Sequence, residues 1–88
     1  MTPAFDARMK GLISALLYPI QFERDPVDGI DRVLQVIVRA RALDGSPEQY
    51  AAAVDAALRS DESLSQLIPQ PHSEPVIRTY LAVLRPRL

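Results

Sequence analysis

The chain has 88 residues, no cysteine and a formal net charge of −1, and hydrophobic residues make up 48% of it. This length predicts a single domain over residues 1–88, and the hydrophobic fraction is too high for a disordered chain. The lack of cysteine excludes disulfides and thiolate metal sites. The near-neutral charge provides no overall field that would draw the protein to nucleic acid or to a membrane.

No run of the sequence approaches the roughly 20 apolar residues that span a membrane. The segment GLISALLYPI follows Arg8 and Lys10 and is faintly similar to a signal peptide. However, Asp6 lies in the region that would have to be basic, and no cleavage site of small residues follows. We therefore expect a cytoplasmic protein.

A first helix is expected from a start at Thr2-Pro3 to about Tyr18, where Pro19 ends it. Its apolar residues recur at helical spacing, which predicts one buried face: Phe5, Met9, Leu12, Ile13, Leu16 and Leu17. In the connector 19–24, Ile20 and Phe22 are expected to enter the core.

Residues 26–43 predict a central helix. Asp25 can cap it, Pro26 suits its first position, and Asp44-Gly45 can end it. Its polar side chains fall on one narrow stripe, which is typical of a helix with neighbours on several sides. A buried strand at 36–38 is an alternative, but length and caps favour a helix. Gly29 could allow a close helix crossing.

Three further helices follow. Ser46 and Gln49 match a capping box, so a helix is predicted from Pro47 to about Arg59. A short helix begins near 60–63, and a last one follows the proline-rich stretch 69–75. Their expected buried residues are Tyr50, Ala51, Val54, Ala57 and Leu58, then Leu64, Leu67 and Ile68, then Val76, Ile77, Tyr80, Leu81 and Leu84. The sequence thus predicts an all-α fold: a single compact bundle of about five helices, four main and one short, around the helix at 26–43.

We find no set of residues in the sequence that could act together in catalysis. The single histidine, His72, is followed directly by Ser73 and Glu74, and adjacent residues cannot converge as a triad. The glycines are isolated, so no phosphate-binding loop is present, and no calcium-loop spacing occurs. We therefore expect a structural or exposed role for His72, no enzymatic activity, no metal and no cofactor.

Acidic residues gather in two segments, 23–31 and 44–62. Helix capping and solubility account for several of them. The alternative is a protein-binding surface, because complementary charge sets association rate and partner choice. The residues expected to face a partner are Asp28, Asp31, Asp44, Glu48, Asp55, Asp61 and Glu62. The pattern predicts a small protein-binding module. The most specific form of this prediction is a bacterial immunity or antitoxin-type inhibitor of a basic partner such as a toxin or nuclease.

Two alternatives remain open. One is an accessory subunit that associates with itself as a homo-oligomer. It would use apolar side chains that do not all fit inside a core this small: Tyr18, Ile20, Phe22 and Val83. The other is a regulator similar to helix-turn-helix proteins, with residues 47–59 as the DNA-reading helix. Glu48 and Asp55 on that helix would repel phosphates, so the charges argue against a nucleic-acid partner.

Overall fold

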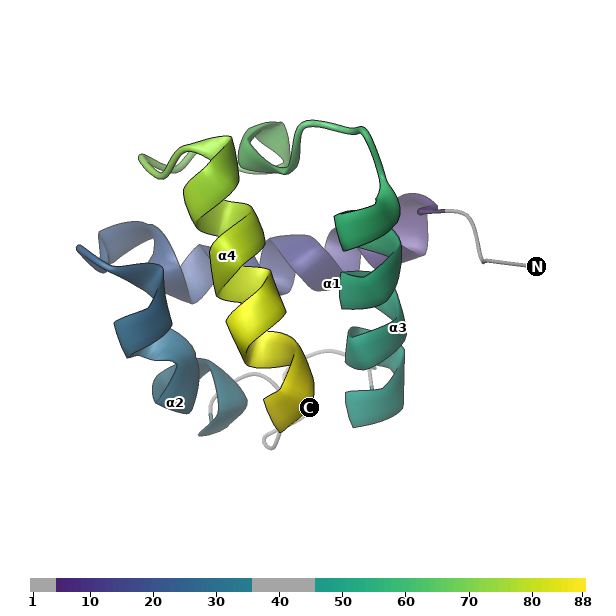
Figure 1. The fold of residues 1–88 in the computed structure, drawn as a ribbon, viewed down its shortest axis with the longest axis horizontal. Coiled ribbons are helices and arrows are strands. Elements are labelled where there is room, and N and C mark those ends of the chain that lie inside the picture. The colour runs from purple at the N-terminus through teal and green to yellow at the C-terminus, as the bar shows by residue number, and fades with distance from the viewer. Residues whose placement is uncertain (1–4, 36–45) are drawn as a thin grey trace.

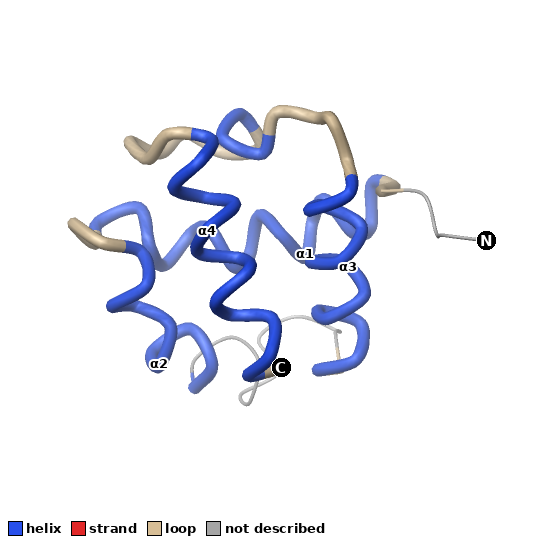
Figure 2. Tube along the Cα trace, viewed as in Figure 1, coloured by secondary structure: helices blue, strands red, loops and turns tan. Residues whose placement is uncertain are grey.

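The computed structural model describes residues 5–35 and 46–88, and every regular element within these ranges is helical (Figures 1 and 2). The predicted all-α fold is therefore confirmed. The α-helices are α1 (Ala7–Leu17), α2 (Ile30–Val33), α3 (Pro47–Arg59) and α4 (Glu74–Leu84). The 3-10 turns are η1 (Tyr18–Phe22), η2 (Pro26–Gly29), η4 (Leu64–Gln66) and η5 (Arg85–Arg87).

Helix α1 begins later than the sequence suggested. Asp6, rather than Thr2, precedes its first turn, and the Asp6 carboxylate accepts a 2.9 Å hydrogen bond from the Met9 N–H. Asp6 is a better cap than the local pattern indicated, because a carboxylate also interacts favourably with the helix dipole. The predicted end near Tyr18 is confirmed, since the 3-10 turn η1 with Pro19 follows directly.

The predicted helix at 26–43 opens with a 3-10 turn and becomes α-helical only at Ile30. Asp25 caps this turn as expected, because its carboxylate accepts a 3.1 Å hydrogen bond from the Val27 N–H. The expected polar stripe is present in the described part, where Asp28, Asp31, Arg32 and Gln35 are exposed while Ile30, Val33 and Leu34 are buried. Residues 36–43 lie outside the described part of the chain.

Helix α3 has the predicted bounds and the predicted cap. The Ser46 hydroxyl accepts from the Gln49 N–H at 3.2 Å, and the Gln49 side chain accepts from the Ser46 N–H at 2.8 Å. In Figure 1, α1 runs across the molecule behind α4, and α4 lies between α2 and α3.

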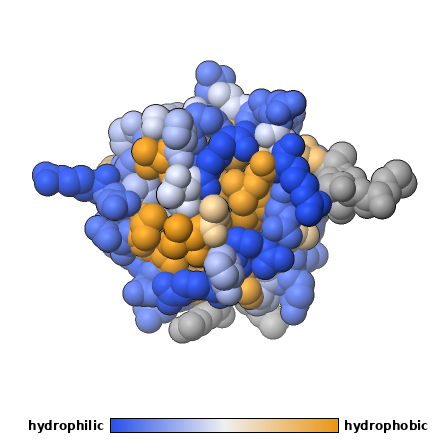
Figure 3. Space-filling view, viewed as in Figure 1, coloured by the Kyte–Doolittle hydropathy of each residue, from blue (hydrophilic) through white to orange (hydrophobic). Residues whose placement is uncertain are grey.

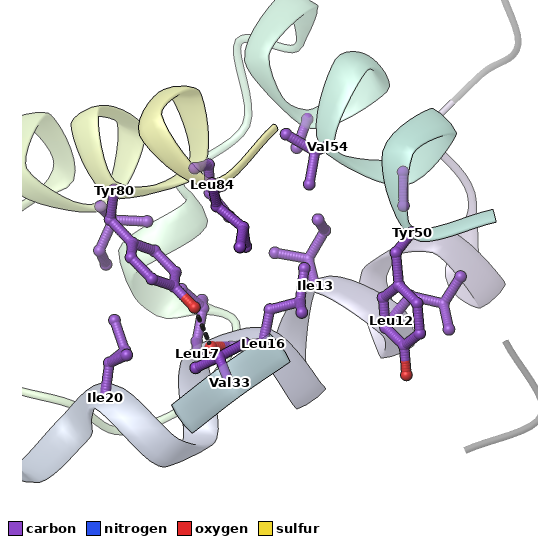
Figure 4. Packing of buried hydrophobic residues seen from close by; sticks show 14 of the residues in the cluster. Leu12, Ile13, Leu16, Leu17, Ile20, Val33, Tyr50, Val54, Tyr80 and Leu84 are labelled. Carbon is purple, nitrogen blue, oxygen red and sulfur yellow. Dashed lines mark hydrogen bonds between the residues drawn. The ribbon is translucent and has the colours of Figure 1, made fainter. Parts of the chain in front are cut away.

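The core collects side chains from all four α-helices and from η1 (Figure 4). Its largest fully buried members include both Tyr50 and Tyr80. The Tyr80 hydroxyl donates a 2.7 Å hydrogen bond to the Leu16 carbonyl. Pro19 has no N–H to give that carbonyl in the 3-10 pattern, so the tyrosine supplies the missing donor.

Two predicted core residues are on the surface instead. Ile20 is buried as expected, but Phe22 is 87% exposed. The 3-10 turn of η1 explains this difference, because it turns these two positions to different sides of the chain. Val76 is 40% exposed, since the buried face of α4 runs through Ile77, Tyr80, Leu81 and Leu84.

No described helix is long and apolar enough to cross a membrane.

Candidate protein-binding surface

The structure places six of the seven predicted partner-facing acids, and Asp44 lies outside the described residues. They occupy three separate places. Asp28 and Asp31 lie on η2 and α2, Glu48 and Asp55 lie on α3, and the remaining two follow the end of α3. Because α4 lies between α2 and α3 (Figure 1), the structure does not gather all six on one surface.

Two of these carboxylates are paired with arginines at the end of α4 and in η5. Asp55 receives two hydrogen bonds from the Arg85 guanidinium, at 2.9 Å and 3.1 Å. The hydrogen bond from Arg85 lowers the pKa of Asp55, and the nearby positive charges add to this effect. Asp31 accepts from Arg87 at 2.6 Å. The carboxyl end of α4 is thereby tied to α3 on one side and to α2 on the other.

A third predicted residue, Glu62, pairs with Lys10 of α1 at 2.9 Å. The other described acids of the set, Asp28, Glu48 and Asp61, are exposed, and none of them forms an ion pair with a described residue. Within the described residues, these three carboxylates are therefore accessible to an external partner. Of the predicted set, they are the side chains best suited to bind another protein.

Asp28 belongs to a surface that also carries exposed aromatic side chains. Tyr18 and Phe22, at the two ends of η1, are 66% and 87% exposed. Glu23 and Asp25 follow Phe22 directly in the chain and lead into the turn that holds Asp28. We call these five residues the aromatic–acidic surface. Local sequence could have pointed to it, because Phe22 directly precedes the acidic segment.

Burial of Ile20 and two hydrogen bonds to its carbonyl hold the turn that carries Phe22 in place. The Ile20 side chain is fully buried, and its carbonyl accepts from the Glu23 N–H at 3.0 Å and from Nε2 of His72 at 2.9 Å. A carbonyl can only accept, so Nε2 of His72 carries the proton. Of the two roles expected for His72, structural or exposed, this hydrogen bond favours the structural one.

Gly29 brings η2 close to the same turn. A Cβ at this position would lie 3.1 Å from Cγ of Glu23 and 3.3 Å from Cγ2 of Ile20. These distances are shorter than ordinary van der Waals contact, so the Glu23 and Ile20 side chains would have to shift to make room for a Cβ. Gly29 thus permits a close approach, but the neighbouring element is the 3-10 turn η1 and not a crossing α-helix.

A second polar cluster, Glu74 and Arg78, has a structural role that local sequence does not reveal. The Arg78 guanidinium donates to the carbonyls of Ser60 and Glu62 at 2.9 Å and 3.0 Å and also reaches two carbonyls at the end of α3. Glu74 accepts from the backbone N–H groups of Leu64 and Ser65 at 3.0 Å and 2.8 Å.

Partial burial acts to raise the pKa of Glu74, but the two backbone N–H groups and Arg78 outweigh it and lower that pKa. These hydrogen bonds all join Glu74 and Arg78 to the connection between α3 and α4, and together they hold that connection in place.

Among the described residues, no group of histidine and acidic side chains could hold a metal ion. No protein-family model matches the chain, and no curated protein or solved structure gives a significant match.

Proposed function

We propose that this chain is a small protein-binding module without catalytic activity, and in its most specific form an immunity or antitoxin-type inhibitor of a basic toxin or nuclease. The observation that carries the proposal is a set of exposed carboxylates that form no ion pair with any described residue: Asp28, Glu48 and Asp61. Asp28 is the strongest of them, because its turn η2 packs against η1, the turn that carries the exposed Tyr18 and Phe22.

Exposed charge of one sign favours a partner of opposite charge. Carboxylates that are already paired inside the chain contribute little to such recognition, whereas free ones raise the association rate with a basic surface. Exposed aromatic side chains supply the desolvated contacts that keep such a complex together. The aromatic–acidic surface therefore combines both requirements.

Co-purification with the products of neighbouring reading frames tests the proposal. We expect one of them, a basic protein, to form a stable complex that weakens as salt is raised. Asp28→Lys should weaken this complex most, and Glu48→Lys, the same reversal of an acid on α3 that lies away from η1 and its exposed aromatic side chains, should weaken it less. The proposal fails if the basic products bind neither the wild-type chain nor its variants.

The exposed valines of α4 favour a second candidate function, self-association. Val76 and Val83 are 40% and 42% exposed, and their seven-residue spacing places them on one side of the helix. Figure 3 shows apolar side chains on the face that carries α4. Light scattering distinguishes this candidate, because Val83→Asp should dissociate a dimer that uses this face. A monomer at high protein concentration would exclude it.

A further inference from the structure

Phe22 has the features of an anchor residue. It is 87% exposed, although burying a phenylalanine side chain gains about 1.5–3 kcal/mol. Residues that dominate binding energy are mostly large side chains that fill a pocket on the partner. Covering Phe22 with another molecule would therefore gain the free energy of burial that the free protein does not obtain.

The turn beneath Phe22 is already in a fixed conformation. Pro19 restricts its backbone, Ile20 is fully buried, and His72 bonds to the Ile20 carbonyl at 2.9 Å. A side chain presented from a fixed turn loses less conformational entropy on binding than one on a mobile loop. These three features therefore fix the position of Phe22 before a partner binds.

The charges around Phe22 determine which molecule can cover it. Within residues 23–31, four acids are accompanied by Arg24 alone, and only Asp31 has an ion pair to another part of the described chain. A second copy of this chain, docked through the same surface, would bring two acidic segments together, and like charges in contact are costly. Nucleic acid and anionic lipid are repelled for the same reason.

We propose that Phe22 inserts into an apolar pocket ringed by Lys and Arg on a partner protein, with Asp25 and Asp28 facing the basic rim. This inference rests on the proposed binding function and adds the partner's chemistry to it. Phe22 then contributes most of the binding free energy of the complex, and the carboxylates raise the association rate.

Selection from a displayed library of short random peptides against the wild-type chain tests the inference. We expect selected peptides to carry Lys or Arg beside large apolar residues. Phe22→Ala should weaken their binding by about 30-fold, mainly through faster dissociation. Val83→Ala, which truncates another exposed apolar side chain, should change it less than about threefold. Circular dichroism should show both variants folded, since neither side chain is in the core.

Three results would overturn the inference: selected peptides that bind Phe22→Ala as well as the wild type, a selection that yields no cationic peptides at low salt, or a wild-type dimer that Phe22→Ala dissociates. A complex with a neighbouring gene product that persists unchanged in Phe22→Ala would refute this inference while leaving the proposed function intact. If that complex never forms, the proposed function itself fails.

Discussion

The two buried tyrosines provide a paired test of the core, because only one of their hydroxyls has a hydrogen-bond partner in the part of the chain that the structure describes. Tyr80 and Tyr50 are both fully buried, and burial raises the pKa of each. The Tyr80 hydroxyl donates to the Leu16 carbonyl at 2.7 Å (Figure 4), whereas the Tyr50 hydroxyl has no hydrogen-bond partner among the described residues. Replacing each tyrosine by phenylalanine removes one oxygen and leaves the packing of the ring in place.

Tyr80→Phe should destabilise the fold by about 1–3 kcal/mol, because it leaves the buried Leu16 carbonyl without this donor. Tyr50→Phe should instead stabilise it by about 1 kcal/mol, because it removes a buried polar group that no described residue hydrogen-bonds. For a domain of this size, each kcal/mol corresponds to about 4–8 °C in Tm.

Urea denaturation followed by circular dichroism measures both changes, provided that the slope with denaturant stays constant. The two variants should move the midpoint in opposite directions. If Tyr50→Phe destabilises the protein as much as Tyr80→Phe does, the Tyr50 hydroxyl has a partner in solution and the reasoning is wrong. Equal stability of Tyr80→Phe and the wild type would also contradict it.

Other substitutions and pH test further contacts. Gly11→Ala should raise the free energy of unfolding by about 0.5–1 kcal/mol, because its Cβ meets nothing within 4 Å. Gly29→Ala should give no such gain, because its Cβ would lie 3.1 Å from Cγ of Glu23. Thermal melts that rank the two variants the other way would refute this. Arg78→Ala should cost about 2 kcal/mol in urea unfolding, and Arg59→Ala, on the exposed side of α3, less than about 0.5. Asp55 has a folded pKa below its usual 3.8, so its contribution to stability is present above that value and is lost as the pH falls through the lowered pKa. Denaturation from pH 5 to pH 2 should therefore show a weaker pH dependence for Asp55→Asn than for the wild type.

Local signals in the sequence were sufficient for much of the fold. The capping box at Ser46 and Gln49 and the cap at Asp25 depend on residues two or three positions apart, so spacing alone reveals them. The periodicity of apolar residues likewise located the buried faces of α1 and α3. The start of α1 was missed, because Thr2-Pro3 matches a helix start in the sequence, whereas in the structure the Asp6 carboxylate caps the first turn.

Long-range pairs are the features that the sequence did not reveal. Asp55 and Arg85 are 30 positions apart, and the Tyr80–Leu16 hydrogen bond joins positions 64 apart. Such contacts depend on how helices pack, which periodicity does not encode. The same reason explains why Asp55 appeared available to a partner in the sequence and is paired inside the fold.

The aromatic–acidic surface was only partly predictable. The acidic segment is visible in the sequence, but an apolar residue such as Phe22 ordinarily predicts burial. Its exposure follows from the 3-10 geometry of η1 and from the small core, which Ile20 fills from the same turn.

The most direct test of the binding proposal is amide chemical-shift mapping of the isotope-labelled protein as the basic product of a neighbouring reading frame is added. The account predicts that the largest changes fall on residues 18–31, and that Phe22→Ala abolishes them at the same concentrations. Changes centred on α3, or none at any concentration, would contradict it.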